Sequence, residues 1–206
     1  MYEQEVQLLV SRYKIAPLIK RPKLPVYLSI CGLVLLFLFS GQWLRAQQSF
    51  YDFTIEDIHG QEFDLAQLQG MKVLVVNTAS KCALTPQYEA LERLYRTYGG
   101  GDFIILAFPS NDFGHQEPGS NNDIDAFCTA EYGISFPLMA KIIVKGEEMH
   151  PLYRWLTKAS ENGVEESRVS WNFQKYMIDK GGRLVGHAPP WRKPESKEIV
   201  TWITEE

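Results

Sequence analysis

Cys82 and Cys128 are the side chains of this 206-residue chain best suited to nucleophilic or redox chemistry. The third cysteine, Cys31, lies in an apolar N-terminal stretch, so the three do not supply the disulfide framework of a small secreted domain. Cys82 follows a strand pattern, precedes a helical pattern and has Lys81 beside it. A helix N-terminus and a nearby cation both favour the thiolate, which is the reactive form. We predict that Cys82 is a nucleophile, with a buried structural cysteine as the alternative.

The spacing after Cys82 indicates a single thiol rather than a dithiol. A dithiol exchange enzyme has a second cysteine three positions later, and Thr85 stands there instead. Cys82 is therefore expected to attack alone.

Apolar patterning predicts the elements that position these cysteines. Two continuous runs rich in β-branched residues, 73–77 and 103–108, are typical of buried strands. A helical pattern opens at Pro86, directly after the Cys82 segment. Another helix, from Asn122 to about Tyr132, is expected to carry Cys128.

The rest of the globular part completes an α/β pattern. We expect hairpins from 50–56 with 62–65 and from 173–179 with 183–187, a strand at 141–144, and helices at 151–156 and 195–204. The segment 189–194 is interpreted as a rigid connector, with an exposed aromatic site for lipid or a partner as the alternative. This order of elements predicts a thioredoxin-like α/β fold, with a mixed central sheet flanked by helices on both faces.

Three segments together resemble the cysteine-type, non-selenium glutathione peroxidases. We call them the first, second and third signatures. In that order they read Asn-Thr-Ala-Ser-Lys-Cys-Ala-Leu-Thr-Pro-Gln-Tyr at 77–88, Phe-Pro-Ser-Asn-Asp-Phe-Gly-His-Gln-Glu-Pro-Gly at 108–119 and Trp-Asn-Phe at 171–173. The resemblance runs from about Phe50 to the C-terminus and implies a thiol peroxidase that needs no cofactor. It assigns Cys82 as the residue that attacks the peroxide O–O bond and becomes a sulfenic acid.

The same resemblance implies roles for four further residues. Gln116, Trp171 and Asn172 would supply neutral N–H donors that stabilise the thiolate and the departing oxygen. Cys128 matches the resolving cysteine of the thioredoxin-dependent, monomeric branch, and would form a disulfide with Cys82. The reductant is then a thioredoxin-like protein or glutathione. The short stretch 158–170 fits that branch, because it lacks the long insertion of tetrameric relatives that use glutathione.

The N-terminal region differs in character from the rest. Residues 24–44 contain no charge and are long enough to cross a bilayer as a helix of roughly 30 Å. Residues 1–45 carry six Lys or Arg and two Glu, so the positive-inside rule keeps residues 1–23 cytoplasmic. We predict a signal anchor at 24–44 and a peroxidase domain at 45–206 in the periplasm, a lumen or outside the cell. A cleaved signal peptide is the alternative.

Composition excludes some other functions. After residue 45, 23 acidic residues outnumber 15 basic ones, which argues against nucleic-acid binding. The four histidines show no paired spacing, so no metal site is expected. Two alternatives use the same cysteines: a membrane-tethered thiol–disulfide oxidoreductase and a redox-sensing module.

Overall fold

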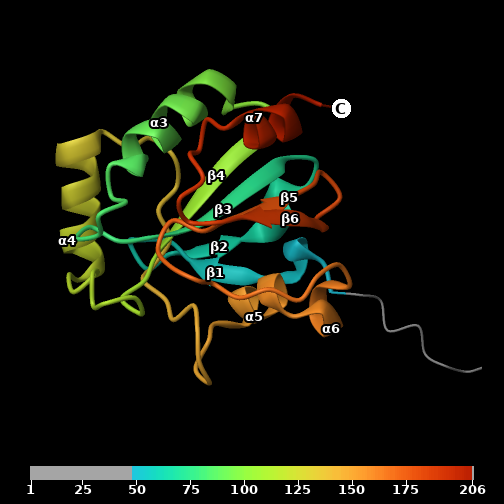
Figure 1. Cartoon of the computed structure of the whole chain (residues 1–206), viewed down its shortest axis with the longest axis horizontal. Coiled ribbons are helices and arrows are strands. Elements are labelled where there is room, and N and C mark those ends of the chain that lie inside the picture. The colour runs from blue at the N-terminus through green and yellow to red at the C-terminus, as the bar shows by residue number, and fades with distance from the viewer. Residues whose placement is uncertain (1–47, 206) are drawn as a thin grey trace, which may run out of the picture. The chain divides into compact units, whose positions relative to one another are not determined.

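The computed structural model describes residues 48–205, which contain a four-stranded mixed sheet (Figure 1). The strands are β3 (Lys72–Thr78), β4 (Phe103–Pro109), β5 (Lys175–Ile178) and β6 (Leu184–Ala188), in the spatial order β4-β3-β5-β6. β3 pairs parallel with β4 and antiparallel with β5, and β5 pairs antiparallel with β6. The mixed central sheet predicted from the sequence is confirmed.

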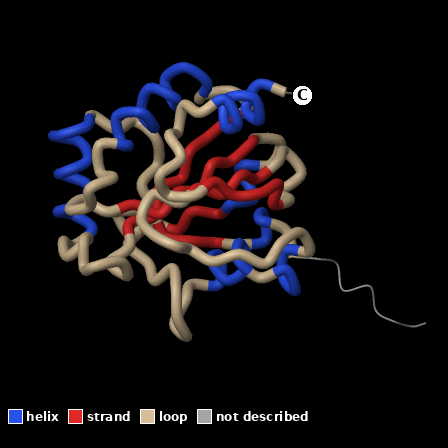
Figure 2. The backbone as a smooth tube through the Cα atoms, in the orientation of Figure 1, coloured by secondary structure: helices blue, strands red, loops and turns tan. Residues whose placement is uncertain are grey.

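β3 and β4 are buried on both faces, which explains their continuous apolar runs. Along β3, Val73 and Val75 pack into one core, whereas Leu74 and Val76 pack into the other. The first core is covered by α5 (Pro151–Thr157), and the second by α3 (Gln87–Tyr98), α4 (Asn121–Phe127) and α7 (Lys197–Thr204). Figure 2 shows the strands enclosed by helices, as the predicted fold requires.

Shorter elements complete the domain. They are the 3-10 turns η1 (Phe50–Asp52) and η2 (Leu65–Leu68), the hairpin strands β1 (Thr54–Glu56) and β2 (Glu62–Asp64), the π turn η3 (Cys128–Tyr132) and α6 (Ala159–Asn162). The first hairpin strand is shorter than predicted because Ser49 caps η1, its side chain accepting a hydrogen bond from the Tyr51 N–H.

The strand predicted at 141–144 is wrong. Its backbone groups form no strand ladder: Ile142 N–H donates to the carbonyl of Pro109, the last residue of β4, at 3.0 Å, and Val144 N–H donates to a side-chain atom, Asp112 Oδ2, at 2.6 Å. The bridges to the sheet and to the first hairpin are made just before it, by Leu138 and Met139. An apolar run of this length does not reveal where its hydrogen bonds go.

The segment 189–194 is fastened to the domain, as the connector interpretation predicts. The buried Lys175 ammonium donates to the carbonyls of Pro190 at 3.1 Å and Arg192 at 2.6 Å, and to Gln87 Oε1 at 2.5 Å. Trp191 is nevertheless 71% exposed.

The predicted membrane segment, 24–44, lies outside the residues that the structure describes. Between residues 48 and 205, none of the helices combines the length and the apolar character that crossing a bilayer requires.

Candidate active site

Cys82 lies in a tight turn between the C-terminal end of β3 and the start of α3. Its backbone N–H donates to Thr85 Oγ1 at 2.9 Å, and the Thr85 hydroxyl donates to the Ala79 carbonyl at 2.8 Å. The Leu84 N–H points at Cys82 Sγ, 3.4 Å away. A donor directed at sulfur stabilises the negative charge of a thiolate. The turn thus buries the thiol and aims an N–H group at it.

Lys81, the cation predicted beside Cys82, has an exposed side chain. Burial raises the pKa of the nearby Glu117 carboxyl, and the Lys81 charge is among the smaller effects that lower it. The hydrogen bonds found around the Cys82 turn come from backbone N–H groups and from the Thr85 and Ser80 hydroxyls.

The second signature is bonded directly to the Cys82 turn. The Gln116 carbonyl accepts a hydrogen bond from Lys81 N–H at 2.9 Å. The next residue, Glu117, accepts from Ser80 twice, from the N–H at 2.8 Å and from the hydroxyl at 2.5 Å. Three hydrogen bonds therefore fix Gln116 and Glu117 beside the residues that precede Cys82.

The third signature is held by Asn77, at the end of β3. Asn77 Nδ2 donates to the Trp171 carbonyl at 3.1 Å, and the Asn77 carbonyl accepts from Phe173 N–H at 2.6 Å. Phe173 has a φ of 69°, an uncommon conformation for a bulky side chain that clusters at functional sites. This bend turns the Asn172 side chain inward, where it is fully buried.

Asn172 joins the second and third signatures. Its Nδ2 donates to Gln116 Oε1 at 3.1 Å, which leaves the Gln116 Nε2 group as a donor for another oxygen. The Trp171 ring packs against Phe113, with 5.5 Å between the centroids, and is 39% exposed. The structure therefore brings Gln116 and Asn172 into contact, while Trp171, the residue before Asn172, is partly exposed at the surface.

Cys128 lies on a different element, where α4 gives way to the π turn η3. It is fully buried, and burial raises the pKa of its thiol to about 12, with the negative charge of Glu117 adding to the effect. Cys82 and Cys128 pack in the same core beside the sheet, and both are free thiols. Cys128, the resolving residue that the resemblance implies, thus packs on the same side of the sheet as Cys82. Its thiol is buried and protonated in this conformation.

Three positioning residues emerge only from the contacts: Asn77, Thr85 and Glu117. Each lies inside one of the three signatures, which is the one sequence feature that could have pointed to it. The signature does not say what the side chain contacts. Asn77 orients the third signature, Thr85 fixes the Cys82 turn, and Glu117 binds the second signature to Ser80.

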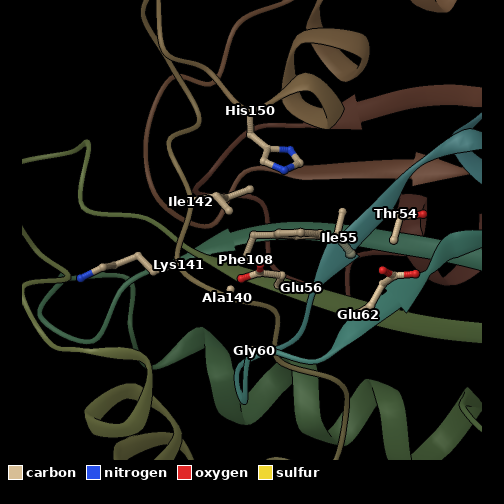
Figure 3. A pocket seen from close by; sticks show the side chains of 10 residues that line it. All are labelled: Thr54, Ile55, Glu56, Gly60, Glu62, Phe108, Ala140, Lys141, Ile142 and His150. Carbon is tan, nitrogen blue, oxygen red and sulfur yellow. The ribbon is translucent and has the colours of Figure 1, made fainter.

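A cavity of about 620 Å³ lies away from these residues, next to the β1–β2 hairpin (Figure 3). Glu56, Glu62 and His150 are among the side chains that line it, and none of the predicted site residues does. A second cavity, of about 350 Å³, separates Ser80 and Lys81 from Ile124 and Phe127 of α4. The smaller cavity thus lies between the Cys82 turn and the helix that leads to Cys128.

The fold and the site define a class of protein, a thiol peroxidase built on a thioredoxin-like domain. Comparisons with known proteins agree. The pattern of the family described as "Glutathione peroxidase" matches residues 50–157. The chain is 43% identical over 148 residues to the glutathione peroxidase homolog BsaA of Staphylococcus epidermidis, covering 72% of this chain and 93% of that protein.

Two further relatives extend the agreement. The glutathione peroxidase-like peroxiredoxin gpx1 of Schizosaccharomyces pombe is 45% identical over 149 residues, covering 72% of this chain and 94% of that protein. The apo crystal structure of Trgpx superposes with a TM-score of 0.61 at 38% identity, covering 78% of this chain and 98% of that one. The chain belongs to the glutathione peroxidase family, and it is a thiol peroxidase of this type with an antioxidant role.

Proposed function

We propose that the chain is a two-cysteine peroxidase that reduces hydrogen peroxide and organic hydroperoxides, including lipid hydroperoxides, with electrons from a thioredoxin-like protein. The main observation behind the proposal is the 3.1 Å hydrogen bond from Asn172 to Gln116, which brings two neutral amides together. The Gln116 backbone is itself bonded to the Cys82 turn, through Lys81 N–H. Support for the reductant comes from relatives named as peroxiredoxins and from a second cysteine in the same core. Glutathione is the alternative reductant.

The first step takes place at Cys82. Its thiolate attacks the distal oxygen of the hydroperoxide, so an S–O bond forms, the O–O bond breaks, and an alkoxide or hydroxide leaves and is protonated. Negative charge moves from sulfur to the leaving oxygen during this step. The Gln116 Nε2 group and the Trp171 indole N–H are the neutral donors proposed to stabilise that charge without competing as nucleophiles.

The second step requires Cys128 to move. A fully buried thiol whose pKa is raised to about 12 stays protonated at neutral pH and does not reach solvent. The 350 Å³ cavity between α4 and the Cys82 turn gives the helix room to rearrange. We therefore propose that α4 and η3 open locally, so that Cys128 forms a disulfide with Cys82. Amide-exchange protection of 121–132 that is equal in the reduced and oxidised protein would exclude this opening.

The predicted anchor bears on the substrate. A helix at 24–44 would hold the peroxidase domain at a membrane, where oxidised acyl chains are a source of lipid hydroperoxides. Turnover of a phospholipid hydroperoxide no greater than background would exclude lipid hydroperoxides as substrates.

The anchor also decides which reductant is available. We propose that residues 1–23 lie in the cytoplasm and that the monomeric peroxidase domain lies across the membrane. Cytosolic thioredoxin does not reach that compartment, so the reductant would be a dithiol protein on the same side. Protease protection of the C-terminal domain in sealed membrane vesicles tests this orientation.

Steady-state peroxide consumption tests the catalytic cycle. Full-length wild type, Cys82→Ser and Cys128→Ser are compared with a thioredoxin system and with glutathione as donors. We expect thioredoxin-driven turnover that is lost in both variants. Glutathione-driven turnover that persists in Cys128→Ser would indicate a one-cysteine enzyme. Absence of turnover with either donor would favour the thiol–disulfide oxidoreductase or the sensor.

A further inference from the structure

Tyr88 connects the third signature to the turn that carries Cys128. It lies six residues after Cys82, near the start of α3, and is fully buried. Its ring meets Phe173 edge to face, with 5.3 Å between the centroids. On another side it packs against Tyr132, the last residue of η3, also at 5.3 Å. Rearrangement of η3 must therefore separate the Tyr88 and Tyr132 rings.

The π turn is a suitable place for such a rearrangement. α4 ends at Phe127, and η3 changes the hydrogen-bonding register from Cys128 onward. π turns interrupt the α-helical ladder and often mark functional sites. The Tyr132 ring also packs against Phe127, with 5.7 Å between the centroids. Tyr132 thus packs on Tyr88 and on Phe127, and these aromatic contacts hold the residues on both sides of Cys128 in the closed form.

The hydroxyl of Tyr88 has the opposite effect. It lies beside the Thr78 hydroxyl and the Cys128 thiol, close enough to influence the pKa of the thiol. Within residues 48–205, however, neither the Tyr88 nor the Thr78 hydroxyl completes a hydrogen bond of regular geometry. A buried polar group without a partner destabilises the conformation that buries it. The hydroxyl therefore weakens the closed form that the ring stabilises.

We propose that Tyr88 is a positioning residue that sets how fast Cys128 is released to resolve Cys82. Its ring holds η3 closed, and its unpartnered hydroxyl keeps the closed form from becoming too stable. This inference rests on the proposed role of Cys128 as the resolving cysteine. In the step it controls, the Cys128 sulfur attacks the sulfenic sulfur of Cys82. The S–S bond forms, the S–O bond breaks, and the hydroxyl group leaves with the thiol proton as water.

Two substitutions at Tyr88 should change this step in opposite directions. Tyr88→Phe keeps the ring and removes the hydroxyl, so disulfide formation should be about fivefold slower than in wild type. Tyr88→Leu removes the ring, so disulfide formation should be about tenfold faster. In Tyr88→Phe, which keeps the packing on Phe173, the rate at which Cys82 reacts with peroxide should stay within about twofold of wild type. In Tyr88→Leu the disulfide step is timed from the trapped sulfenic acid onward, so that it is measured separately from the first step.

The measurement is a quenched-flow experiment on the full-length protein with one equivalent of hydrogen peroxide. Dimedone traps the Cys82 sulfenic acid, and mass spectrometry quantifies the Cys82–Cys128 disulfide over time. Tyr153→Phe is the matched control, because Tyr153 is also fully buried with an unpartnered hydroxyl, but it packs in the core on the other face of the sheet. The control should leave disulfide formation unchanged. Urea unfolding of each variant separates a general loss of stability from a change in this step alone.

Several outcomes would overturn the proposal. Equal disulfide rates in wild type, Tyr88→Phe and Tyr88→Leu would refute it and leave the two-cysteine cycle intact, as would the reverse order of rates. If Tyr88→Leu does not fold, Tyr132→Leu removes the same ring contact from a half-buried position and should also accelerate disulfide formation. If wild type itself forms no Cys82–Cys128 disulfide, the proposed function fails, and this inference fails with it.

Discussion

The Thr85 hydroxyl accepts a hydrogen bond from the Cys82 backbone N–H at 2.9 Å, at the position where a dithiol enzyme has its second cysteine. The same hydroxyl donates to the Ala79 carbonyl at 2.8 Å, so it closes the turn on both sides of Cys82. Thr85 is itself buried. A residue that replaces a second thiol thus has a structural task, which is to fix the turn that presents the single nucleophile.

Thr85→Val should impair both stability and the first chemical step. The valine leaves the Cys82 N–H and the Ala79 carbonyl without a partner, which should lower the free energy of unfolding by about 1–3 kcal/mol. The rate of Cys82 oxidation should fall about tenfold, because the thiol is no longer held in place. Urea unfolding and stopped-flow oxidation measure the two effects. Thr85→Ser keeps the hydroxyl and should retain most of the stability and most of the oxidation rate. A serine variant as impaired as the valine variant would contradict this role.

Gln116→Ala and Asn172→Ala should each slow the reaction of Cys82 with hydrogen peroxide by about 100-fold. The two amides are hydrogen-bonded to each other, so the double variant should lose less than the product of the single losses. Stopped-flow measurement of sulfenic acid formation in a double-mutant cycle checks this. Gln67→Ala, at an exposed amide, is the control and should react like wild type. Strictly multiplicative losses would mean that the two residues act independently.

Glu117→Ala should destabilise the domain by about 1–3 kcal/mol, because the Ser80 N–H and hydroxyl lose their shared acceptor. Glu117→Gln keeps an oxygen at this place and should lose less. Thermal and urea unfolding of the two variants give the comparison. Glu147→Ala removes an exposed carboxylate and is expected to leave stability within about 0.5 kcal/mol of wild type. Equal losses in the Ala and Gln variants would show that charge, rather than the hydrogen bonds to Ser80, stabilises this loop.

The Cys128 thiol should make stability depend on alkaline pH. Burial raises its pKa to about 12 in the folded protein, from an ordinary value of 9.0. Between these values the unfolded chain has lost a proton that the folded chain keeps, so the free energy of unfolding falls as pH rises. The loss is about 1.4 kcal/mol per pH unit above 9, and absent below it.

Urea unfolding of wild type and Cys128→Ala at pH 8 and pH 10 isolates this contribution. Wild type should lose about 1.4 kcal/mol more than the variant between the two pH values. Because all other titrating groups are shared, the difference between the two proteins reports on Cys128 alone. A pH dependence that is the same in both would mean that the thiol is not buried in the way the structure shows.

Local sequence patterns predicted much of the fold. The runs 73–77 and 103–108 became β3 and β4 almost residue for residue, because strands buried on both faces need continuous apolar side chains. The helix after Cys82 begins at Gln87, one residue beyond the predicted start. The segment 141–144 is also mostly apolar but forms no ladder, because Ile142 bonds only to the last residue of β4 and Val144 bonds to a side chain. Hydrogen-bond partners distant in the chain decided that difference.

In the candidate site, too, some features were predictable from local sequence and others depended on tertiary structure. The chain's signature segments alone identified Cys82, Gln116, Trp171 and Asn172 as candidates, since residue type and local spacing are properties of the sequence. Only the tertiary structure decided that Asn172 bonds to Gln116, 56 positions away, and that Tyr88 packs on both Phe173 and Tyr132, the last residue of the turn that carries Cys128. The physical reason is that a hydrogen bond or a buried contact depends on distances in space, and these are set by how the whole sheet and its helices pack.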